Sequence, residues 1–261
     1  MPWRFLPYAE RSGAENMAID ELLLDDLIAG TGAPTLRLYG FTPAAVSVGL
    51  NQKLDDDTVA RIKSAGLDLV RRPTGGRAVL HQSDLTYSFV GLEESRGGPL
   101  KSSVTSAYKQ ICQGLILALR ELGVPTELGE SHTAYRHLAD CFLATTPADL
   151  HHKGRKIAGS AQLRRKGVVL QHGSLPLLQA QESMSNLLDA DSGVAAVSSG
   201  QSLGSRHVNL FELIAQSSCS DLNEPFRRGF EVAFNVELKT QELTAQELER
   251  ALTRKPEFTQ V

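Results

Sequence analysis

The sequence predicts an α+β fold in which a mixed β-sheet is flanked by helices. Apolar residues recur at three- and four-residue steps between residues 102 and 123, which predicts one long helix facing a core. Residues 150–177 have the pattern of strands instead, and Lys166-Gly167 is typical of a hairpin turn between two of them. Helices and hairpin-type strands therefore interleave. This order favours a mixed sheet over a regular βαβ winding.

The N-terminal half is divided by capping residues, glycines and prolines. Ser12 and Glu15 form a capping box, so we expect a helix to begin there and to end at Gly30 or Gly32. Alternating or β-branched apolar residues bounded by glycine and proline predict short strands, and acidic residues in a first turn predict a helix start. These signals give strands at 35–40, 44–49, 67–72, 78–81 and 85–91, and a helix at 55–66.

The C-terminal half continues with the long helix at 102–123 and with strands at 154–165 and 167–177. Residues 189–206 are rich in Ser, Gly and Ala and predict a surface loop or hinge. Apolar residues at helical spacing then predict three further helices, at 208–216, 224–234 and 242–252.

Composition limits the classes of protein that this chain can belong to. It has 261 residues, 41% hydrophobic and 22% charged, which is typical of one globular domain and excludes a disordered, collagen-like or coiled-coil chain. The net charge of −3 gives no general attraction to nucleic acid or to an anionic membrane. We therefore expect neither as a partner.

Cysteine usage and hydropathy predict a cytoplasmic protein. Cys112, Cys141 and Cys219 are far apart and form no Cys-x-x-Cys pair, which argues against a disulfide framework and a cysteine zinc site. The longest apolar run, at 114–119, is far too short to span a membrane.

Several common functional signatures are missing or weak. The chain has no P-loop, and the glycines at 30–35 do not complete a dinucleotide fingerprint, so ATP and NAD sites are not supported. Ser47 lies in a poor match to a nucleophile elbow, and we interpret it as a plain strand serine. His151 and His152 are adjacent on a strand without an acidic or thiol partner at ligand spacing, so we expect solvated histidines and no metal. The acidic pairs at 25–26 and 55–57 are interpreted as solvated faces or cap positions.

One loop motif favours a binding function. Residues 71–77, Arg-Arg-Pro-Thr-Gly-Gly-Arg, leave a predicted strand. Gly75 and Gly76 allow main-chain N–H groups to approach a ligand closely, and the flanking arginines can donate to a carbonyl, carboxylate or phosphate. The alternative is a glycine turn with surface arginines.

A second motif covers residues 154–162 and 171–175. The small residues of Gly159-Ser160-Ala161 predict a strand face against which something packs tightly. Six basic residues and no acid lie between positions 153 and 166, namely Lys153, Arg155, Lys156, Arg164, Arg165 and Lys166. This basic run either receives an acidic partner protein or is a solvated strand edge protected by lysines.

Together, the segments at 71–81 (RRPTGGRAVLH), 85–89 (LTYSF), 154–162 (GRKIAGSAQ) and 170–174 (LQHGS) resemble the catalytic domain of the lipoate and biotin protein ligases. The resemblance runs from residue 16 to about residue 235. It implies a fold like that of biotin ligases and class II aminoacyl-tRNA synthetases. We expect residues 1–240 to form this catalytic domain and residues 241–261 to be its C-terminal helical tail.

Within that family, Gly-Gly-Arg in place of three glycines, and Asp140-Cys141-Phe142 ahead of residue 154, are similar to the cysteine-dependent octanoyltransferases. Leu85 stands where the lipoate ligases carry asparagine. The resemblance implies transfer of an octanoyl group from octanoyl-acyl carrier protein to a lysine of a lipoyl domain, as the first step of lipoate biosynthesis, with no cofactor. The acceptor is the glycine-cleavage H protein or an acyltransferase subunit of an oxo-acid dehydrogenase.

Three alternatives stay open at this point. One is an ATP-dependent lipoate or biotin ligase on the same scaffold. Another is an amidotransferase that moves octanoyl between lipoyl-domain proteins. The third is a relative that binds a lipoyl domain or an acyl ligand without turnover.

The resemblance also assigns roles to residues. Cys141 attacks the octanoyl thioester, a donor that is already activated, and Lys156 hydrogen-bonds the acyl carbonyl and favours the thiolate. The wall of the acyl site is expected to comprise Arg72, Thr74, Gly75, Gly76 and His81, with Ser160 and Ala161 opposite. The alternatives are a small buried apolar residue for Cys141 and a surface strand lysine for Lys156. Cys112 and Cys219 receive no role.

Overall fold

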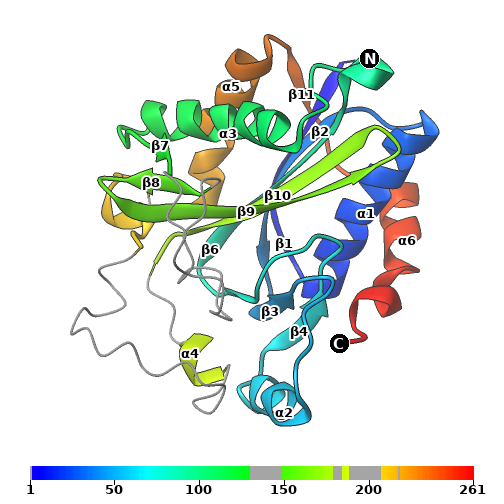
Figure 1. Ribbon diagram of the computed structural model, residues 1–261, viewed down its shortest axis with the longest axis vertical. Helices are drawn as coiled ribbons and strands as arrows, with labels where there is room; N and C mark the ends of the chain where they lie inside the picture. Colours follow the sequence, from blue (N-terminus) through cyan, green and yellow to red (C-terminus); the bar gives the residue numbers. More distant parts are fainter. Residues whose placement is uncertain (1, 130–148, 179–183, 188–206, 217) are drawn as a thin grey trace.

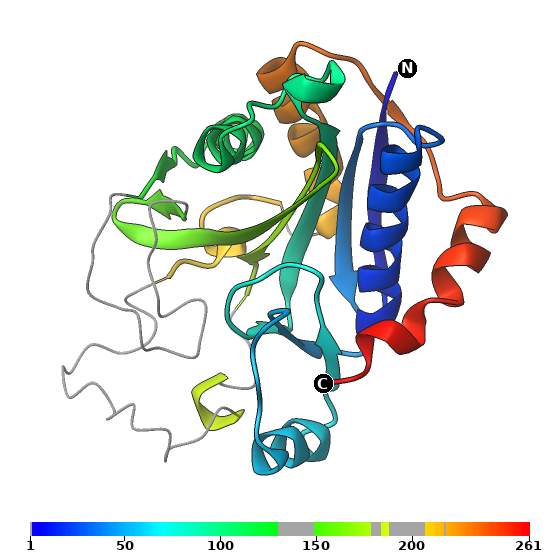
Figure 2. The same cartoon turned by 45° about the vertical axis from the view of Figure 1, so that its right-hand side comes forward.

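The computed structural model describes residues 2–129, 149–178, 184–187, 207–216 and 218–261, and it contains a large and a small sheet (Figures 1 and 2). The large sheet has eight strands in the order β11-β1-β2-β6-β10-β9-β8-β7. It is mixed, because β1 runs parallel to β2 and β11 while the pairs from β2 to β7 are antiparallel. The strands are β1 (Trp3–Arg11), β2 (Thr35–Phe41), β6 (Asp84–Leu92), β7 (Glu127–Leu128), β8 (Leu150–His152), β9 (Arg155–Arg165), β10 (Val168–Pro176) and β11 (Leu238–Thr240).

The small sheet carries the loop motif singled out above. Its order is β4-β3-β5, with β3 (Ala45–Val48), β4 (Asp68–Arg71) and β5 (Val79–His81). The loop at 72–78 connects β4 to β5, and α2 (Asp56–Ser64) lies between β3 and β4 in the chain. Asp55 caps α2, because its side chain accepts a hydrogen bond from the Thr58 main-chain N–H.

Helices cover the two faces of the large sheet. On one face lies α1 (Gly13–Ala29), and on the other lie α3 (Val104–Glu121) and α5 (Asn223–Phe234) (Figures 1 and 2). Ser12 and Glu15 form the predicted capping box of α1, and Gly30 ends the helix in a left-handed conformation. Shorter helical segments are α4 (Met184–Leu187), α6 (Ala245–Leu252), η1 (Glu94–Arg96), η3 (Leu210–Glu212), η4 (Cys219–Leu222) and η5 (Lys255–Phe258).

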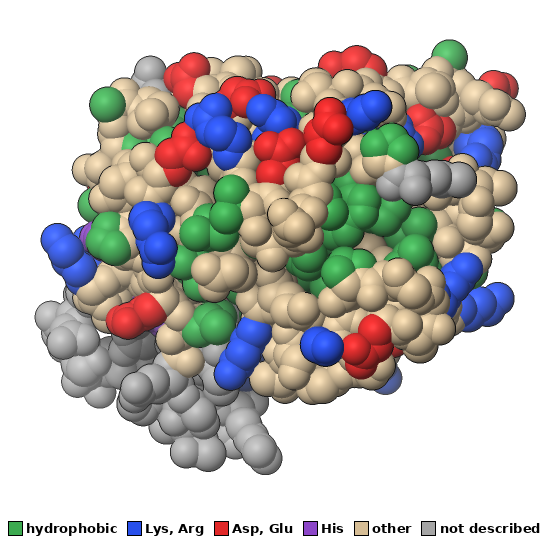
Figure 3. All heavy atoms as spheres, turned by 90° about the horizontal axis from the view of Figure 1, so that it is seen from above, with side chains coloured by type: hydrophobic (Ala, Val, Ile, Leu, Met, Phe, Trp, Pro, Cys, Tyr) green, Lys and Arg blue, Asp and Glu red, His purple; other side chains and the backbone are tan. Residues whose placement is uncertain are grey.

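Strand alternation divides the side chains between two cores. On β2, Leu36 and Leu38 join the core under α3 and α5, while Tyr39 joins the core under α1. Seen from above, acidic and basic side chains are interspersed around exposed apolar surface (Figure 3). Arg228 of α5 forms an ion pair with Glu121 of α3. The described part of the chain has no helix that is both long and apolar enough to cross a bilayer.

The predicted hairpin is confirmed, but the long strand β1 and the short strands β7 and β11 were missed. Lys166 and Gly167 join β9 to β10 with φ of 50° and 74°, as a type I′ turn requires. The sequence analysis did not predict β1. Pro7 interrupts its pattern, and the pairing with β2 shifts register between Leu6 and Ala9.

Two C-terminal predictions hold and one is wrong. Helices are present at α5 and α6, but residues 208–216 contain only the 3-10 turn Leu210–Glu212. Long-range main-chain bonds hold this segment: the Val208 N–H donates to the Lys156 carbonyl and the Phe211 N–H to the Leu177 carbonyl. The predicted loop at 189–206 lies outside the described residues.

The predicted solvated histidines and the basic run require correction. His151 and His152 are both buried, because β8 is an inner strand between β7 and β9. Of the basic run, Lys156 is buried, Arg164 pairs with Glu93 at 2.8 Å, and Arg165 pairs with Glu21. These positions therefore do not form one basic ribbon open to an acidic partner.

The acidic pair at 25–26 is not simply solvated. Asp25 pairs with Arg254 at 2.8 Å, and Asp26 pairs with Arg250 at 2.5 Å. Both arginines belong to the C-terminal segment that contains α6, which lies on the outer side of α1 (Figure 2).

Candidate active site

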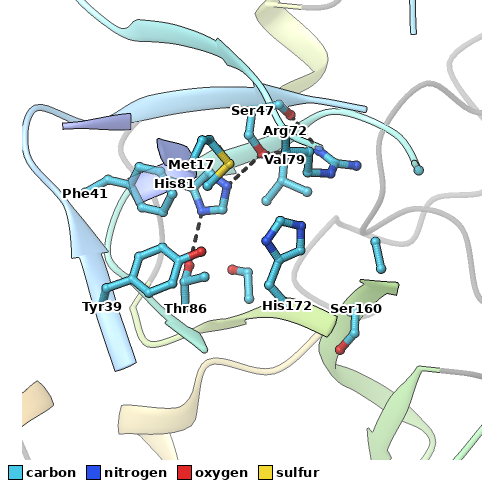
Figure 4. Close-up of a pocket in the computed structure, with 15 residues that line it drawn as sticks. Met17, Tyr39, Phe41, Ser47, Arg72, Val79, His81, Thr86, Ser160 and His172 are labelled. Atoms are coloured by element: carbon cyan, nitrogen blue, oxygen red, sulfur yellow. Dashed lines mark hydrogen bonds between the residues drawn. The ribbon is translucent and has the colours of Figure 1, made fainter. Parts of the chain in front are cut away.

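A pocket lies where the small sheet meets the face of the large sheet that carries α1 (Figure 4). It is an open hollow of about 460 Å³, counted out to its mouth. Its lining is mainly apolar and comes from α1, β2, β3, β5, β6, β9, β10 and the loop at 72–78. Arg72, Gly76, His81, Ser160 and Ala161, five of the residues expected at the acyl site, are in this lining.

Arg72 holds the loop in shape. Its NH2 group donates to the carbonyls of Gly75 at 2.9 Å and Arg77 at 2.6 Å, and its NH1 group donates to the Ser47 carbonyl at 2.9 Å. The side chain is 5% exposed. The guanidinium thus fastens both ends of the Gly75-Gly76 turn to β3, as a planar group with several fixed donors can.

The two loop glycines differ in what they require. Gly76 has a φ of 95°, and a Cβ built on it would lie 2.8 Å from NH2 of Arg72. A Cβ on Gly49 would in turn collide with the carbonyl of Gly76. Gly75 is exposed, has open space around it and is not part of the pocket lining. Of the two loop glycines, only Gly76 therefore occupies a position that a larger residue could not take without strain.

Thr74 lies behind the pocket lining and is linked to the large sheet through His172. Its Oγ1 is 2.6 Å from Nε2 of His172, and Nδ1 of His172 is 3.2 Å from Asp20. Burial lowers the pKa of His172, even though the Asp20 carboxylate opposes this shift. A carboxylate only accepts, so neutral His172 donates from Nδ1 to Asp20 and accepts the Thr74 hydroxyl hydrogen at Nε2.

Asp20 is the centre of this network. It is fully buried and accepts hydrogen bonds from Arg37 at 2.9 Å, Tyr39 at 2.9 Å and Ser88 at 2.8 Å. Burial acts to raise its pKa, but the bonds from its partners and the charge of Arg37 outweigh burial and keep the pKa below its usual value. The network fixes α1, β2, β6 and β10 relative to one another on the pocket side.

A second hydrogen-bonded row contains His81. Nε2 of His81 is 2.9 Å from Oγ of Ser47 (Figure 4), and Nδ1 is 2.8 Å from Asp84. Asp84 also accepts from Ser174 at 2.6 Å and Thr86 at 3.1 Å. Both nitrogens of the His81 ring are therefore held, and Ser47 is part of this network rather than an isolated strand serine.

Lys156 lies next to the pocket. A Cβ built on Gly159, which lines the pocket, would be 3.2 Å from Nζ of Lys156. The lysine side chain is 2% exposed and pairs with Asp149 at 3.1 Å. A surface strand lysine, the alternative considered above, is therefore wrong. A buried, paired ammonium beside a pocket is a common arrangement for stabilising negative charge on a ligand.

Ser160 and Ala161 both line the pocket from β9. Oγ of Ser160 is 2.8 Å from the Tyr87 hydroxyl, on the sheet face that carries α3. Because neighbouring strand side chains alternate, Ala161 presents its methyl group to the opposite face, where the loop at 72–78 lies. Ser160 therefore supports the pocket mainly through its backbone.

The three cysteines have different positions. Cys141 lies outside the described residues, in the segment 130–148 that precedes Asp149. Cys112 is buried in α3, where burial raises its pKa to about 12. Burial also raises the pKa of Cys219. Neither described cysteine has the thiolate character of a nucleophile.

Sequence reasoning missed the polar residues behind the pocket wall and did not single out His172 within its motif. These residues are Asp20, Arg37, Tyr39, Asp84, Asp149 and His172. One signal was available: Asp20 interrupts the apolar stripe of a helix, a position at which a carboxylate needs a buried partner. Across the described ranges, no group of three or more His, Cys, Asp and Glu residues is arranged to hold a metal.

Comparison with known proteins gives relatives over most of the chain. The octanoyltransferase LipM of Anoxybacillus flavithermus is 39% identical over 255 residues, which cover 94% of this chain and 91% of the relative. That of Carboxydothermus hydrogenoformans is 36% identical over 249 residues, 95% of this chain and 92% of the relative. The solved structure of the bi-partite lipoate protein ligase of Thermoplasma acidophilum matches with a TM-score of 0.71 and 22% identity, covering 98% of this chain and 92% of that one.

The likeness to the solved structure agrees with the predicted α+β fold. The sequence identity to the two curated relatives confirms the predicted family. The model of the lipoyl protein ligase A/B catalytic domain matches residues 12–231, a range that includes the loop at 72–78, His81, Lys156 and His172. The chain belongs to the lipoyl protein ligase A/B catalytic-domain family.

Proposed function

We propose that this protein is an octanoyltransferase that moves an octanoyl group from octanoyl-acyl carrier protein to a lysine of a lipoyl domain through a thioester on Cys141. The observation that carries the proposal is the buried ammonium of Lys156, placed beside a mainly apolar pocket. The octanoyltransferase relatives at 36–39% identity support the acyl group and the reaction class. The scattered cysteines support a reducing, cytoplasmic location.

The reaction balances without an added energy source. The Cys141 thiolate attacks the thioester carbonyl, the acyl–sulfur bond to the carrier breaks, and the carrier thiolate takes up a proton. The neutral amine of the acceptor lysine then attacks the acyl-cysteine. An amide forms, the amine loses a proton, and the Cys141 thiol is released. A thioester and a cysteine exchange at nearly constant free energy, so the first step needs no ATP.

Lys156 serves both steps in this proposal. A positive charge near a thiol lowers its pKa and raises the fraction of thiolate. The same ammonium can donate a hydrogen bond to the carbonyl oxygen as negative charge develops on it. Asp149 holds the ammonium in place through the 3.1 Å ion pair, since a buried charge needs a partner of opposite charge.

The pocket supplies the site for the acyl tail. Met17 and Val79 line it along with the ring of Phe41. Each methylene that leaves water contributes about 0.8 kcal/mol, so the octanoyl tail contributes several kcal/mol of binding. We assign Arg72, Gly76 and His81 to one wall, and Ser160 and Ala161 to the opposite wall. Thr74 supports the loop from behind, and Gly75 lies outside the wall with its carbonyl bonded to Arg72.

The first test is the intact mass of the purified protein after incubation with octanoyl-acyl carrier protein and no ATP. We expect the mass of one octanoyl group to be added to wild type and to Cys112→Ala, but not to Cys141→Ala. Addition of a lipoyl domain should then discharge the adduct. No adduct on wild type, with acceptor labelling only from octanoate and ATP, would replace this proposal with a ligase.

The choice of acyl donor separates the remaining alternatives. An amidotransferase would accept octanoyl from an octanoylated lipoyl domain and not from acyl carrier protein. Carrier binding without any turnover would indicate a non-catalytic relative. Octanoyl transfer from the carrier to the H protein or to an acyltransferase subunit is the expected outcome, and the faster acceptor identifies the partner.

A lysine pair tests the role of Lys156. Lys156→Met should lower the rate of acyl-enzyme formation by about 10²–10³-fold, the usual effect of losing one oxyanion donor. Lys153→Met removes an exposed lysine three residues away and should leave the rate unchanged. Thermal unfolding of both variants checks that the fold is retained. A wild-type rate for Lys156→Met would remove this residue from the mechanism.

A further inference from the structure

A second cavity lies beyond one end of the pocket. It measures about 480 Å³ counted out to its open mouth. Phe41 is the residue that lines both cavities. Its ring therefore stands between them as a partition. Leu177, Leu178 and Phe211 form the apolar part of its lining, and the polar part includes Tyr8 and Glu10, whose side chains are hydrogen-bonded to each other at 2.9 Å.

The ring of Phe41 is held in one position. Phe41 ends strand β2, and its ring stacks on the His81 imidazole with centroids 3.9 Å apart and planes 17° apart. The imidazole cannot rotate away freely, because Ser47 and Asp84 hold its two nitrogens. Tyr39 supports Phe41 from the side at a centroid distance of 5.7 Å. These contacts therefore fix the orientation of the Phe41 ring between the two cavities.

The partition lies at the end of the pocket away from Lys156. Phe41 and Ser160 are at opposite ends of the close-up (Figure 4). The Ser160 end adjoins Gly159, and a Cβ built on Gly159 would lie 3.2 Å from Nζ of Lys156. A thioester carbonyl held by Lys156 therefore directs its acyl tail toward Phe41, and the last carbons of the tail meet the ring.

The carboxylates of Glu10 and Asp84 in the second cavity both have hydrogen-bond partners within the protein. The Asp84 carboxylate, which lines the second cavity, accepts from His81, Thr86 and Ser174. Past the ring, the side chains of Leu177 and Phe211 offer carbon surface. Removal of the ring would therefore join the pocket to a space that can accept methylene groups, with an open mouth at its far side.

We infer that Phe41 sets the upper limit of acyl chain length, and that the cavity beyond it is a latent binding site for the distal methylenes of longer fatty acyl chains. This inference rests on the proposed function, because it takes the pocket to be the acyl site. It assigns Phe41 as a specificity-determining residue, with His81 as the residue that positions its ring.

The test compares acyl-carrier donors of 6 to 14 carbons. Phe41→Ala and the milder Phe41→Leu should raise the ratio of dodecanoyl to octanoyl transfer, measured as kcat/KM. Each methylene buried beyond the partition improves binding about fourfold, so four methylenes raise the ratio by about 10- to 200-fold. Phe258→Ala truncates a buried phenylalanine that lines neither cavity and should leave the ratio unchanged.

A second variant tests whether the longer chain uses this cavity. In the Phe41→Ala background, Leu178→Asp places a charge in the second cavity and should remove the gain for dodecanoyl. Binding of free fatty acids of the same lengths, measured by calorimetry, gives a readout that needs no turnover. Should Phe41→Ala fail to fold, Phe41→Leu gives the same comparison.

The outcomes separate this inference from the proposed function. An unchanged chain-length ratio and unchanged fatty-acid binding in the Phe41 variants would overturn the partition while leaving octanoyl transfer intact. Wild type without any octanoyl transfer would overturn the proposed function. In that case the fatty-acid binding series still decides whether Phe41 limits chain length in the pocket.

Discussion

The Thr74 hydroxyl lies 2.6 Å from Nε2 of His172 and joins the glycine loop of the small sheet to a central strand of the large sheet. The two residues are 98 positions apart in the chain. Through His172 the link continues to the buried carboxylate of Asp20. One hydrogen-bonded chain therefore fixes the distance between the pocket's two walls.

Thr74→Val should weaken this link without changing the volume of the side chain. The buried Nε2 of His172 loses its donor, which costs about 1–3 kcal/mol of unfolding free energy. We expect a higher KM for the acyl donor as well, because the loop is no longer fixed. Urea unfolding and acyl-transfer kinetics measure the two effects. Thr74→Ser keeps the hydroxyl and should behave like wild type; equal stability of the Val and Ser variants would contradict the link.

The two loop glycines should respond differently to alanine. Gly76→Ala forces a φ of 95° on an alanine and places its Cβ 2.8 Å from Arg72, so we expect a loss of about 1–3 kcal/mol and impaired acyl transfer. Gly75→Ala meets open space and should change stability by less than about 0.5 kcal/mol. Chemical denaturation of the pair tests this contrast. A strong loss of acyl transfer in stable Gly75→Ala would indicate that a ligand approaches the backbone there.

The stability of the protein should fall as the pH drops below about 6.5. Burial lowers the pKa of His172, so between the folded pKa and the unfolded pKa of about 6.5 the unfolded chain binds a proton that the folded chain does not. The contribution is fully present above the unfolded pKa and is lost as the pH falls through the folded one. Burial lowers the pKa of His151 as well, so His151 contributes to the pH dependence with the same sign. The pKa of Asp20 is also lowered, so Asp20 affects stability only at pH values below the ordinary pKa of an aspartate.

Unfolding free energies at pH 5, 6 and 7 measure this dependence. His172→Gln retains an amide that can donate and accept, but it removes the titrating group. Its unfolding free energy should therefore fall less steeply with decreasing pH than that of wild type, with the remaining slope due to groups such as His151. An identical slope in the variant would show that His172 does not supply the dependence.

Alkylation at neutral pH should distinguish the cysteines. Cys112 is buried with its pKa raised to about 12, and burial also raises the pKa of Cys219. We expect iodoacetamide to modify Cys141 first in the native protein and Cys112 only after unfolding, as read by peptide mass mapping. Octanoyl-acyl carrier protein should protect Cys141. Modification of native Cys112 at the rate of Cys141 would contradict its assignment as a packing residue.

Local signals in the sequence predicted most elements. The capping box at Ser12 and the turn at Lys166-Gly167 are encoded by neighbouring residues, and both are present in the structure. Strand β1 escaped prediction because Pro7 breaks its pattern, and its pairing partner β11 lies more than 200 residues away.

The parts of the candidate site that lie in sequence motifs were predicted, and the parts outside those motifs were not. The loop at 72–78 and the strand that carries Lys156 were identified, but Asp20 and Phe41 were not. Asp20 acts through Arg37, Tyr39 and His172, and Phe41 through His81, contacts that only the packing of α1 and β2 against distant strands creates. The burial of His151 and His152 likewise follows from the sheet order and not from local sequence.

The ion pairs on the outer side of α1 have a consequence for synthesis of the protein. Asp26 meets Arg250, 224 residues later, and one edge of β1 pairs with β11 at residues 238–240. During translation the helix that carries Asp20 therefore emerges long before its outer cover. When a ribosome has reached residue 237, every described residue of the pocket has been synthesised. The edge of β1 and the outer side of α1 are then still exposed, and chaperones bind such exposed surfaces.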